Sequence, residues 1–235
     1  MIFEVLLFSF LAGSTVFVGG VFSYFFERTV YNRKTKIKVA HFLTAFATGV
    51  MLAAVCFVLI PKGMHNLEIG YVVFLFLLGA FIFYFLDDYI KRHSAQIPQV
   101  LAMLLDFVPE SIALGALFVY DHKTGLLLAI FIALQNLPEA FSSYIELRAS
   151  SLSRKVSLAV LFSFSFIGVV FSSIGYMFLN QSDTLTSSLM VFFFFFILYL
   201  IFQDIALSFI TKNSRSIAIG VNLGFALSML AQALT

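Results

Sequence analysis

The chain consists of long apolar stretches separated by short polar ones. Windows of about 20 apolar residues, the length that a helix needs to cross a bilayer, occur eight times. They cover residues 3–26, 39–60, 69–86, 98–120, 125–145, 156–179, 186–210 and 216–235. Runs such as VFFFFFILYLIF do not alternate as the strands of a membrane barrel do, and helices satisfy their own backbone hydrogen bonds in lipid. The pattern predicts an all-α integral membrane protein with eight transmembrane helices.

Composition agrees with this class and limits where function can reside. Hydrophobic residues make up 61% of the 235 residues and charged residues only 11%, which is far from the balance of a soluble domain. The longest polar connection, ERTVYNRKTKIK, follows the first span. There is no room for a separate soluble domain, so residues 1–235 are predicted to form a single transmembrane domain whose function lies within the helix bundle.

The Lys and Arg residues predict the orientation of the chain. Twelve of the 14 fall between spans 1 and 2, 3 and 4, 5 and 6, or 7 and 8, against Lys62 and Lys123 on the other side. By the positive-inside rule these four connections are cytoplasmic and both termini are extracytoplasmic. The basic residues therefore indicate topology and not a nucleic-acid partner. In a bacterium, the membrane would be the cytoplasmic (inner) one.

Two similar motifs lie in the middle of neighbouring spans, LDFVPES at 105–111 and LQNLPEA at 134–140. Only a few residues join these spans, so they are expected to form an antiparallel hairpin with the motifs side by side. Each glutamate follows a proline, which has no amide hydrogen and leaves a carbonyl of the preceding turn without its helical partner. Kinked helices with freed carbonyls are one way to build an ion site within a membrane.

The motifs bring oxygen-bearing side chains to mid-membrane. Asp106 and Glu110 are four residues apart and share a helix face, as do Gln135 and Glu139. An ionised carboxylate at this depth costs from about 3 to more than 10 kcal/mol, and no Lys or Arg is expected there. Protons or a bound cation must therefore neutralise the acids. The alternative, protonated acids that hydrogen-bond neighbouring helices, stays open.

Other positions suggest weaker hypotheses. Asp87, Gln203 and Asp204 lie near the predicted cytoplasmic end, where they form either an exit station for an ion or interfacial groups that reach water. Met51 is either core packing or a soft metal ligand. The phenylalanines at 192–196 are expected to face lipid.

Taken together, the chain resembles the ZIP (Zrt/Irt-like) family of divalent metal transporters, especially its compact bacterial branch. The matching segments are FATGVMLAAVCFVLIP in the second span, LLGAFIFYFLDD in the third, the two P-E motifs, and LGFALSMLAQAL in the eighth. They are spread over most of the chain. The resemblance implies an inverted-repeat bundle with both termini outside, a binuclear metal centre bridged by Glu110 and Glu139, and in many members a homodimer.

The resemblance implies that one metal position draws on Asp106 and Gln135, with Met51 nearby. The family has a histidine where this chain has Asp106. A carboxylate there makes the ligand set harder, which favours Mn, Fe(II) and other hard divalent ions, while Zn, Co and Cd remain allowed.

The second metal position implied by the resemblance is incomplete in this chain. Asn136 can bind a metal weakly, but Phe107 cannot, and Ser165 stands where the family has an acid. We therefore expect one principal site.

The predicted function is uptake of a divalent transition-metal cation toward the cytoplasm by alternating access. The metal is cargo, and neither a prosthetic group nor an enzymatic activity is expected. A first alternative is a ZIP-like protein that senses metal or acts as a scaffold without transporting. A remote alternative is an intramembrane aspartyl protease using Asp106 and Asp204, although the chain lacks the G-x-G-D element of such proteases.

Overall fold

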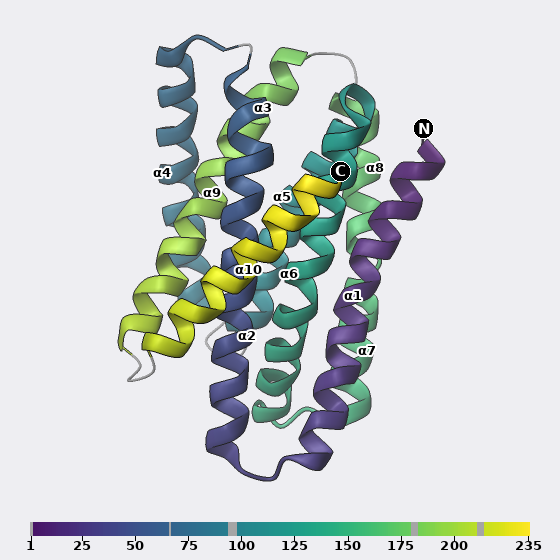
Figure 1. Ribbon diagram of the computed structural model, residues 1–235, viewed down its shortest axis with the longest axis vertical. Helices are drawn as coiled ribbons and strands as arrows, with labels where there is room; N and C mark the ends of the chain where they lie inside the picture. Colours follow the sequence, from purple (N-terminus) through teal and green to yellow (C-terminus); the bar gives the residue numbers. More distant parts are fainter. Residues whose placement is uncertain (1, 66, 94–97, 180–182, 211–213) are drawn as a thin grey trace.

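The structure is a bundle of helices, as Figure 1 shows. The computed structural model describes residues 2–65, 67–93, 98–179, 183–210 and 214–235. Within these ranges every regular element is a helix, and eight helical spans are long and apolar enough to cross a membrane. The prediction of an all-α integral membrane protein with eight spans is confirmed.

Eight spans are built from eleven helical segments, because two spans are divided. The segments are α1 (Ile2–Thr29), α2 (Arg33–Ala54), a π-helical segment (Val55–Leu59), α3 (Ile60–Met64), α4 (Ile69–His93), α5 (Pro98–Tyr120), α6 (His122–Ala149), α7 (Arg154–Phe164), α8 (Ile167–Leu179), α9 (Asp183–Ile210) and α10 (Ser214–Leu234). The second span runs through α2, the π-helical segment and α3. The sixth consists of α7 and α8.

The sixth span is not the continuous helix that its hydropathy predicts. The Ser165 amide bonds to the carbonyls of both Leu161 and Phe162, and the Phe166 amide bonds to the carbonyl of Ser163. These short-range bonds form a tight turn between α7 and α8. The turn lies against Gly13 of α1, where a methyl group would overlap the carbonyl oxygen of Ser165.

The predicted hairpin of the fourth and fifth spans is confirmed. Helices α5 and α6 pack against each other and are joined by one residue, Asp121. Its side chain caps α6, accepting hydrogen bonds from the Thr124 amide at 3.1 Å and the Thr124 hydroxyl at 2.7 Å. Such a cap satisfies an amide at the helix start that has no partner within the helix.

The helices form two groups. The first group, α1, α5, α6 and the α7–α8 pair, is held by the contacts α1–α6, α5–α8 and α5–α6. The second group, α2 with α3, α4, α9 and α10, is held by α2–α10, α4–α9 and α3–α9. In Figure 1, α1 and α7 lie at one side of the bundle and α4 and α9 at the other. The groups meet where α5 packs on α9 and where α2 packs on α6, an interface as extensive as that between α5 and α6.

Glycines allow the closest approaches within each group. A methyl group at Gly19 of α1 would overlap the carbonyl oxygen of Leu137 in α6, and one at Gly49 of α2 would overlap that of Val221 in α10. Small residues of this kind let helix backbones approach in membranes. Since these glycines pack within the chain, they give no separate support to the expected homodimer, which stays a prediction.

Ion pairs tie helices together at both ends of the bundle. At one end, Glu27 of α1 pairs with the Nε atoms of Arg148 and Arg154, each at 3.3 Å. At the other, Lys62 Nζ lies 2.7 Å from Asp121 Oδ2 and links the two groups. Burial alone would raise the pKa of Asp121, but hydrogen bonds from Lys62 and Thr124, with the Lys62 charge, lower this pKa to about 2. The predicted cytoplasmic and extracytoplasmic sides of these ends stay predictions, as does the inverted repeat.

Candidate metal centre

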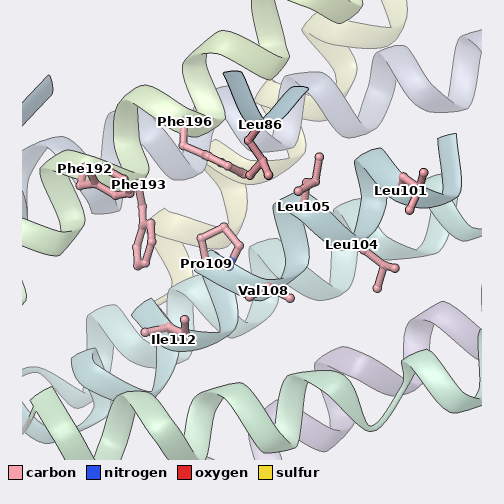
Figure 2. Close-up of a pocket in the computed structure, with 10 residues that line it drawn as sticks. All are labelled: Leu86, Leu101, Leu104, Leu105, Val108, Pro109, Ile112, Phe192, Phe193 and Phe196. Atoms are coloured by element: carbon pink, nitrogen blue, oxygen red, sulfur yellow. The ribbon is translucent and has the colours of Figure 1, made fainter. Parts of the chain in front are cut away.

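Three faces of α5 make three different contacts around the P-E motif. Glu110 meets α6 through Gln135. Phe107, three residues before Glu110, packs against the glycines of α1 and α8. Pro109 lines an apolar groove towards α9 (Figure 2). Within four residues of α5 the chain thus changes from an aromatic contact with α1 and α8 to a polar contact with α6.

The Glu110–Gln135 pair is the polar contact between the two motifs. Gln135 Nε2 donates a hydrogen bond to Glu110 Oε2, and both side chains are fully buried. The motifs were predicted to face each other across the hairpin, and this bond joins them as expected. The role of the two residues as metal ligands stays a prediction.

The remaining predicted ligands are buried on the same helices or on α2. Asp106 lies one turn before Glu110 on α5, Asn136 and Glu139 lie on α6, and Met51 lies on α2, all of them buried. However, across the part of the chain that the structure describes, no three His, Cys, Asp or Glu side chains are gathered as a metal cluster. A metal site here would therefore need donors such as the Gln135 amide in addition to carboxylates.

Several buried polar atoms around the pair have no hydrogen bond. Within the described residues, Glu110 Oε1, Gln135 Oε1, and both Oδ1 and Nδ2 of Asn136 make none. An unsatisfied buried polar group costs about 1–3 kcal/mol, more if it is charged. Three of these four atoms are oxygens, so the middle of the bundle holds electron-pair donors of the kind that bind cations.

Within the part of the chain that the structure describes, no buried basic side chain balances the charge of the acids in the two motifs. Among the side chains that the structure describes, no Lys or Arg is buried. The arginines at 148 and 154 pair with Glu27 near the chain segments between spans, and Lys62 pairs with Asp121 at the opposite end. All three basic side chains are engaged away from the Glu110–Gln135 pair, so none of them neutralises it.

Phe107 and Ser165, which the family resemblance assigns to a second metal position, are both buried. The Phe107 ring is buried and packs where a methyl group on Gly168 would lie 2.6 Å from its Cζ atom. The same atom would lie 3.4 Å from a methyl group on Gly13. Ser165, buried in the turn between α7 and α8, donates its hydroxyl to the Leu161 carbonyl at 3.3 Å. The Phe107 ring has no donor atom for a metal, and the Ser165 hydroxyl is engaged with the backbone of its own helix.

A polar seam between α2 and α6 was not predicted from the sequence. The hydroxyl oxygens of Thr44 and Ser142 lie 3.1 Å apart, and Ser142 also donates to the Ala40 carbonyl at 3.3 Å. Ser142 follows Glu139 by three residues, so it lies on nearly the same face of α6. The three-residue spacing from Glu139 is the sequence feature from which this contact could have been predicted. The seam places hydroxyl and carbonyl oxygens between Glu139 and the α1–α2 end of the bundle.

The predicted exit station is not tested by the structure. The side chains of Asp87, Gln203 and Asp204 lie outside the residues that it describes. The same holds for the aspartate pair of the protease alternative, because that pair includes Asp204.

Comparisons with known proteins give no family assignment. No protein-family profile matches the sequence, and no curated protein matches it.

Proposed function

We propose that the protein carries a divalent transition-metal cation across the membrane, toward the cytoplasm, through the centre at Glu110 and Gln135. Helices α5 and α6 supply the main donors. Asp106 and Glu139, one helical turn from this pair, supply further charge. These are the residues that the resemblance to ZIP transporters, described above, implies as metal ligands.

One observation carries the proposal. A carboxyl group, Glu110, is fully buried in a membrane-spanning bundle beside amide oxygens that have no hydrogen bond among the described residues. No described Lys or Arg is buried to balance it. A carboxylate in such surroundings is stabilised by a cation, and amide oxygens complete the coordination of hard divalent ions.

The ligand set favours hard ions. Carboxylate and amide oxygens suit Mn²⁺ and Fe²⁺ better than the thiolate- and imidazole-rich sites that select softer metals. Met51 adds one thioether sulfur on α2, which keeps Zn²⁺, Co²⁺ and Cd²⁺ within range. Binding displaces protons from the carboxyl groups, so affinity falls as the pH is lowered.

The division of the bundle suits alternating access. Both motif helices belong to the first group, and Met51 belongs to the second. A displacement of one group against the other would change access to the centre from either side, as in transporters that move one bundle against another. The ion gradient or the membrane potential would drive the flux, because the chain has no G-x-x-x-x-G-K-[ST] motif for ATP.

Uptake into proteoliposomes tests the proposal. The purified protein would be reconstituted and offered Mn²⁺, Fe²⁺, Co²⁺, Zn²⁺ and Cd²⁺ in turn. We expect the wild type to accumulate at least one ion, Mn²⁺ or Fe²⁺ most strongly, and Glu110→Gln and Glu139→Gln to lose that uptake.

A matched control lies on the same helix. Glu146 of α6 accepts a hydrogen bond from the Val100 amide at 3.1 Å, and glutamine can accept the same bond, so Glu146→Gln should transport as the wild type does. Equal uptake by all four proteins would end the proposal. Metal binding by the wild type without flux would replace it with the sensor or scaffold alternative.

A further inference from the structure

An apolar groove lies at the boundary between the two helix groups, where α5 faces α4 and α9. It has a volume of about 320 Å³ and is lined by α5 of the first group and by α4 and α9 of the second. All of its lining residues are Leu, Val, Ile, Pro or Phe. In Figure 2, Phe193 extends from α9 towards Pro109 of α5, and Phe196 extends towards Leu86. The groove therefore has no polar side chain to hold water, and an apolar cavity of this kind stays dry.

The phenylalanines that form one wall were expected to face lipid only. Phe196 is instead buried, with its ring centroid 4.0 Å from that of Phe83 on α4. Phe192 and Phe193 are half-buried and line the groove. The run of phenylalanines thus packs partly against α4 and partly along the groove.

The position of the groove matches one leaflet of a bilayer. On α5 its lining runs from Leu101 to Ile112, which is about 17 Å of helix at 1.5 Å per residue. The apolar core of a bilayer is about 30 Å thick, and the α5 span covers Val100–Tyr120. The groove therefore extends from one end of the span to its middle. Leu86, the last residue of the α4 span, lies at the same end.

The size of the groove selects its occupant. A helix about 10 Å across would occupy roughly 1,300 Å³ over that length, far more than the volume of the groove, so a helix of a second protein cannot lie inside it. An apolar cavity of about 150 Å³ holds the six carbons of benzene, so this groove has room for about a dozen carbons. An empty gap would lose the dispersion contacts of its lining.

We propose that this groove binds one acyl chain of a membrane lipid. The lipid belongs to the leaflet at the end of the bundle where the α4 span ends and the α5 span begins. The chain packs between Pro109 of α5 and the phenylalanines of α9 and so forms part of the contact between the two helix groups. The proposal does not depend on metal transport, and its test needs no metal.

The absence of tryptophan makes a site-specific test practical. The sequence contains no Trp, so Phe193→Trp places the protein's single tryptophan in the groove, and it can be excited selectively over tyrosine. The full-length variant would be reconstituted in phosphatidylcholine brominated in the middle of its acyl chains, which quenches a Trp in contact with them. Phe74→Trp, at a side chain 59% exposed on α4, gives the lipid-contact reference, and Phe131→Trp, at a fully buried position, gives the protein-interior reference.

We expect quenching of Phe193→Trp to reach at least half that of Phe74→Trp. Adding Val108→Phe, which fills the groove, should then lower it by at least half, while Val170→Phe on the exposed face of α8 should leave it unchanged. Leu104→Trp provides a second fluorophore in the groove if Phe193→Trp does not fold.

Three results would overturn the proposal. The first is quenching at the groove no stronger than at Phe131→Trp. The second is quenching that Val108→Phe leaves unchanged. The third is quenching that disappears as the protein-to-lipid ratio rises, because a second copy of the chain would then cover the groove.

Discussion

The close contact between α5 and α8 makes a prediction that can be worked from the structure. A methyl group at Gly115 would overlap the carbonyl oxygen of Ser172, and the reciprocal overlap holds for Gly175 and the carbonyl of Ile112. Because the atoms in conflict belong to the backbone, Gly115→Ala must push the two helices apart. Overpacking of this kind costs about 1–3 kcal/mol, and alanine recovers up to about 1 kcal/mol of helix propensity. We expect a net loss of about 1–2 kcal/mol.

Thermal unfolding in detergent, followed by circular dichroism, measures this effect. For a chain of this size, such a loss corresponds to a decrease of about 2–8 °C in Tm. Gly70→Ala on α4 is the matched control, since nothing lies within 4 Å of its added methyl group, and its Tm should stay the same or rise slightly. A Tm for Gly115→Ala equal to or above that of Gly70→Ala would refute the packing argument.

Three further predictions concern ion pairs and packing. The pKa of Asp121 is lowered from 3.8 to about 2, so its pairing with Lys62 stabilises the fold above pH 4 and is lost as the pH falls toward 2. Because both groups are about one-third exposed, the effect is at most about 1 kcal/mol, and Asp121→Asn should remove it from the pH dependence of Tm while keeping the helix cap. Phe107→Ala should lower the free energy of unfolding by about 3–5 kcal/mol. It should leave metal binding unchanged, measured by equilibrium dialysis, and loss of binding in a folded variant would contradict this. Glu27→Gln removes the charge that faces Arg148 and should destabilise the fold by about 1–3 kcal/mol, measured by thermal unfolding, whereas an unchanged Tm would mean that the pair contributes nothing.

The eight spans could be predicted because length and hydropathy alone decide whether a helix can cross a bilayer. The helix ends could not. Helix α2 begins at Arg33 and not at residue 39, since Asn32 caps it by accepting a hydrogen bond from the Lys34 amide at 2.9 Å. The turn at Ser165 was also missed, because it contains neither Pro nor Gly and depends on contact with α1, which a single-helix pattern does not encode.

The candidate site was predictable at the level of helix faces. The four-residue spacing within each motif and the short link between α5 and α6 predict that the faces of Glu110 and Gln135 meet, and the structure joins these two side chains. The distances between the carboxylates of Asp106, Glu110 and Glu139 depend on the rotation and tilt of the helices. The spacing of residues along the sequence does not determine these. The hydroxyl seam at Thr44 and Ser142 likewise depends on how α2 packs on α6.

Equilibrium binding of Mn²⁺ tests the central claim most directly, because it asks whether the buried carboxyl at Glu110 holds a cation, independently of flux. The purified full-length protein would be dialysed against Mn²⁺ at pH 7 and pH 5, and bound metal would be counted per chain for the wild type, Glu110→Gln and Glu146→Gln. The account predicts one ion per chain in the wild type and in Glu146→Gln, weaker binding at pH 5, and loss of the ion in Glu110→Gln. Binding to Glu110→Gln that equals the wild type at both pH values would contradict it.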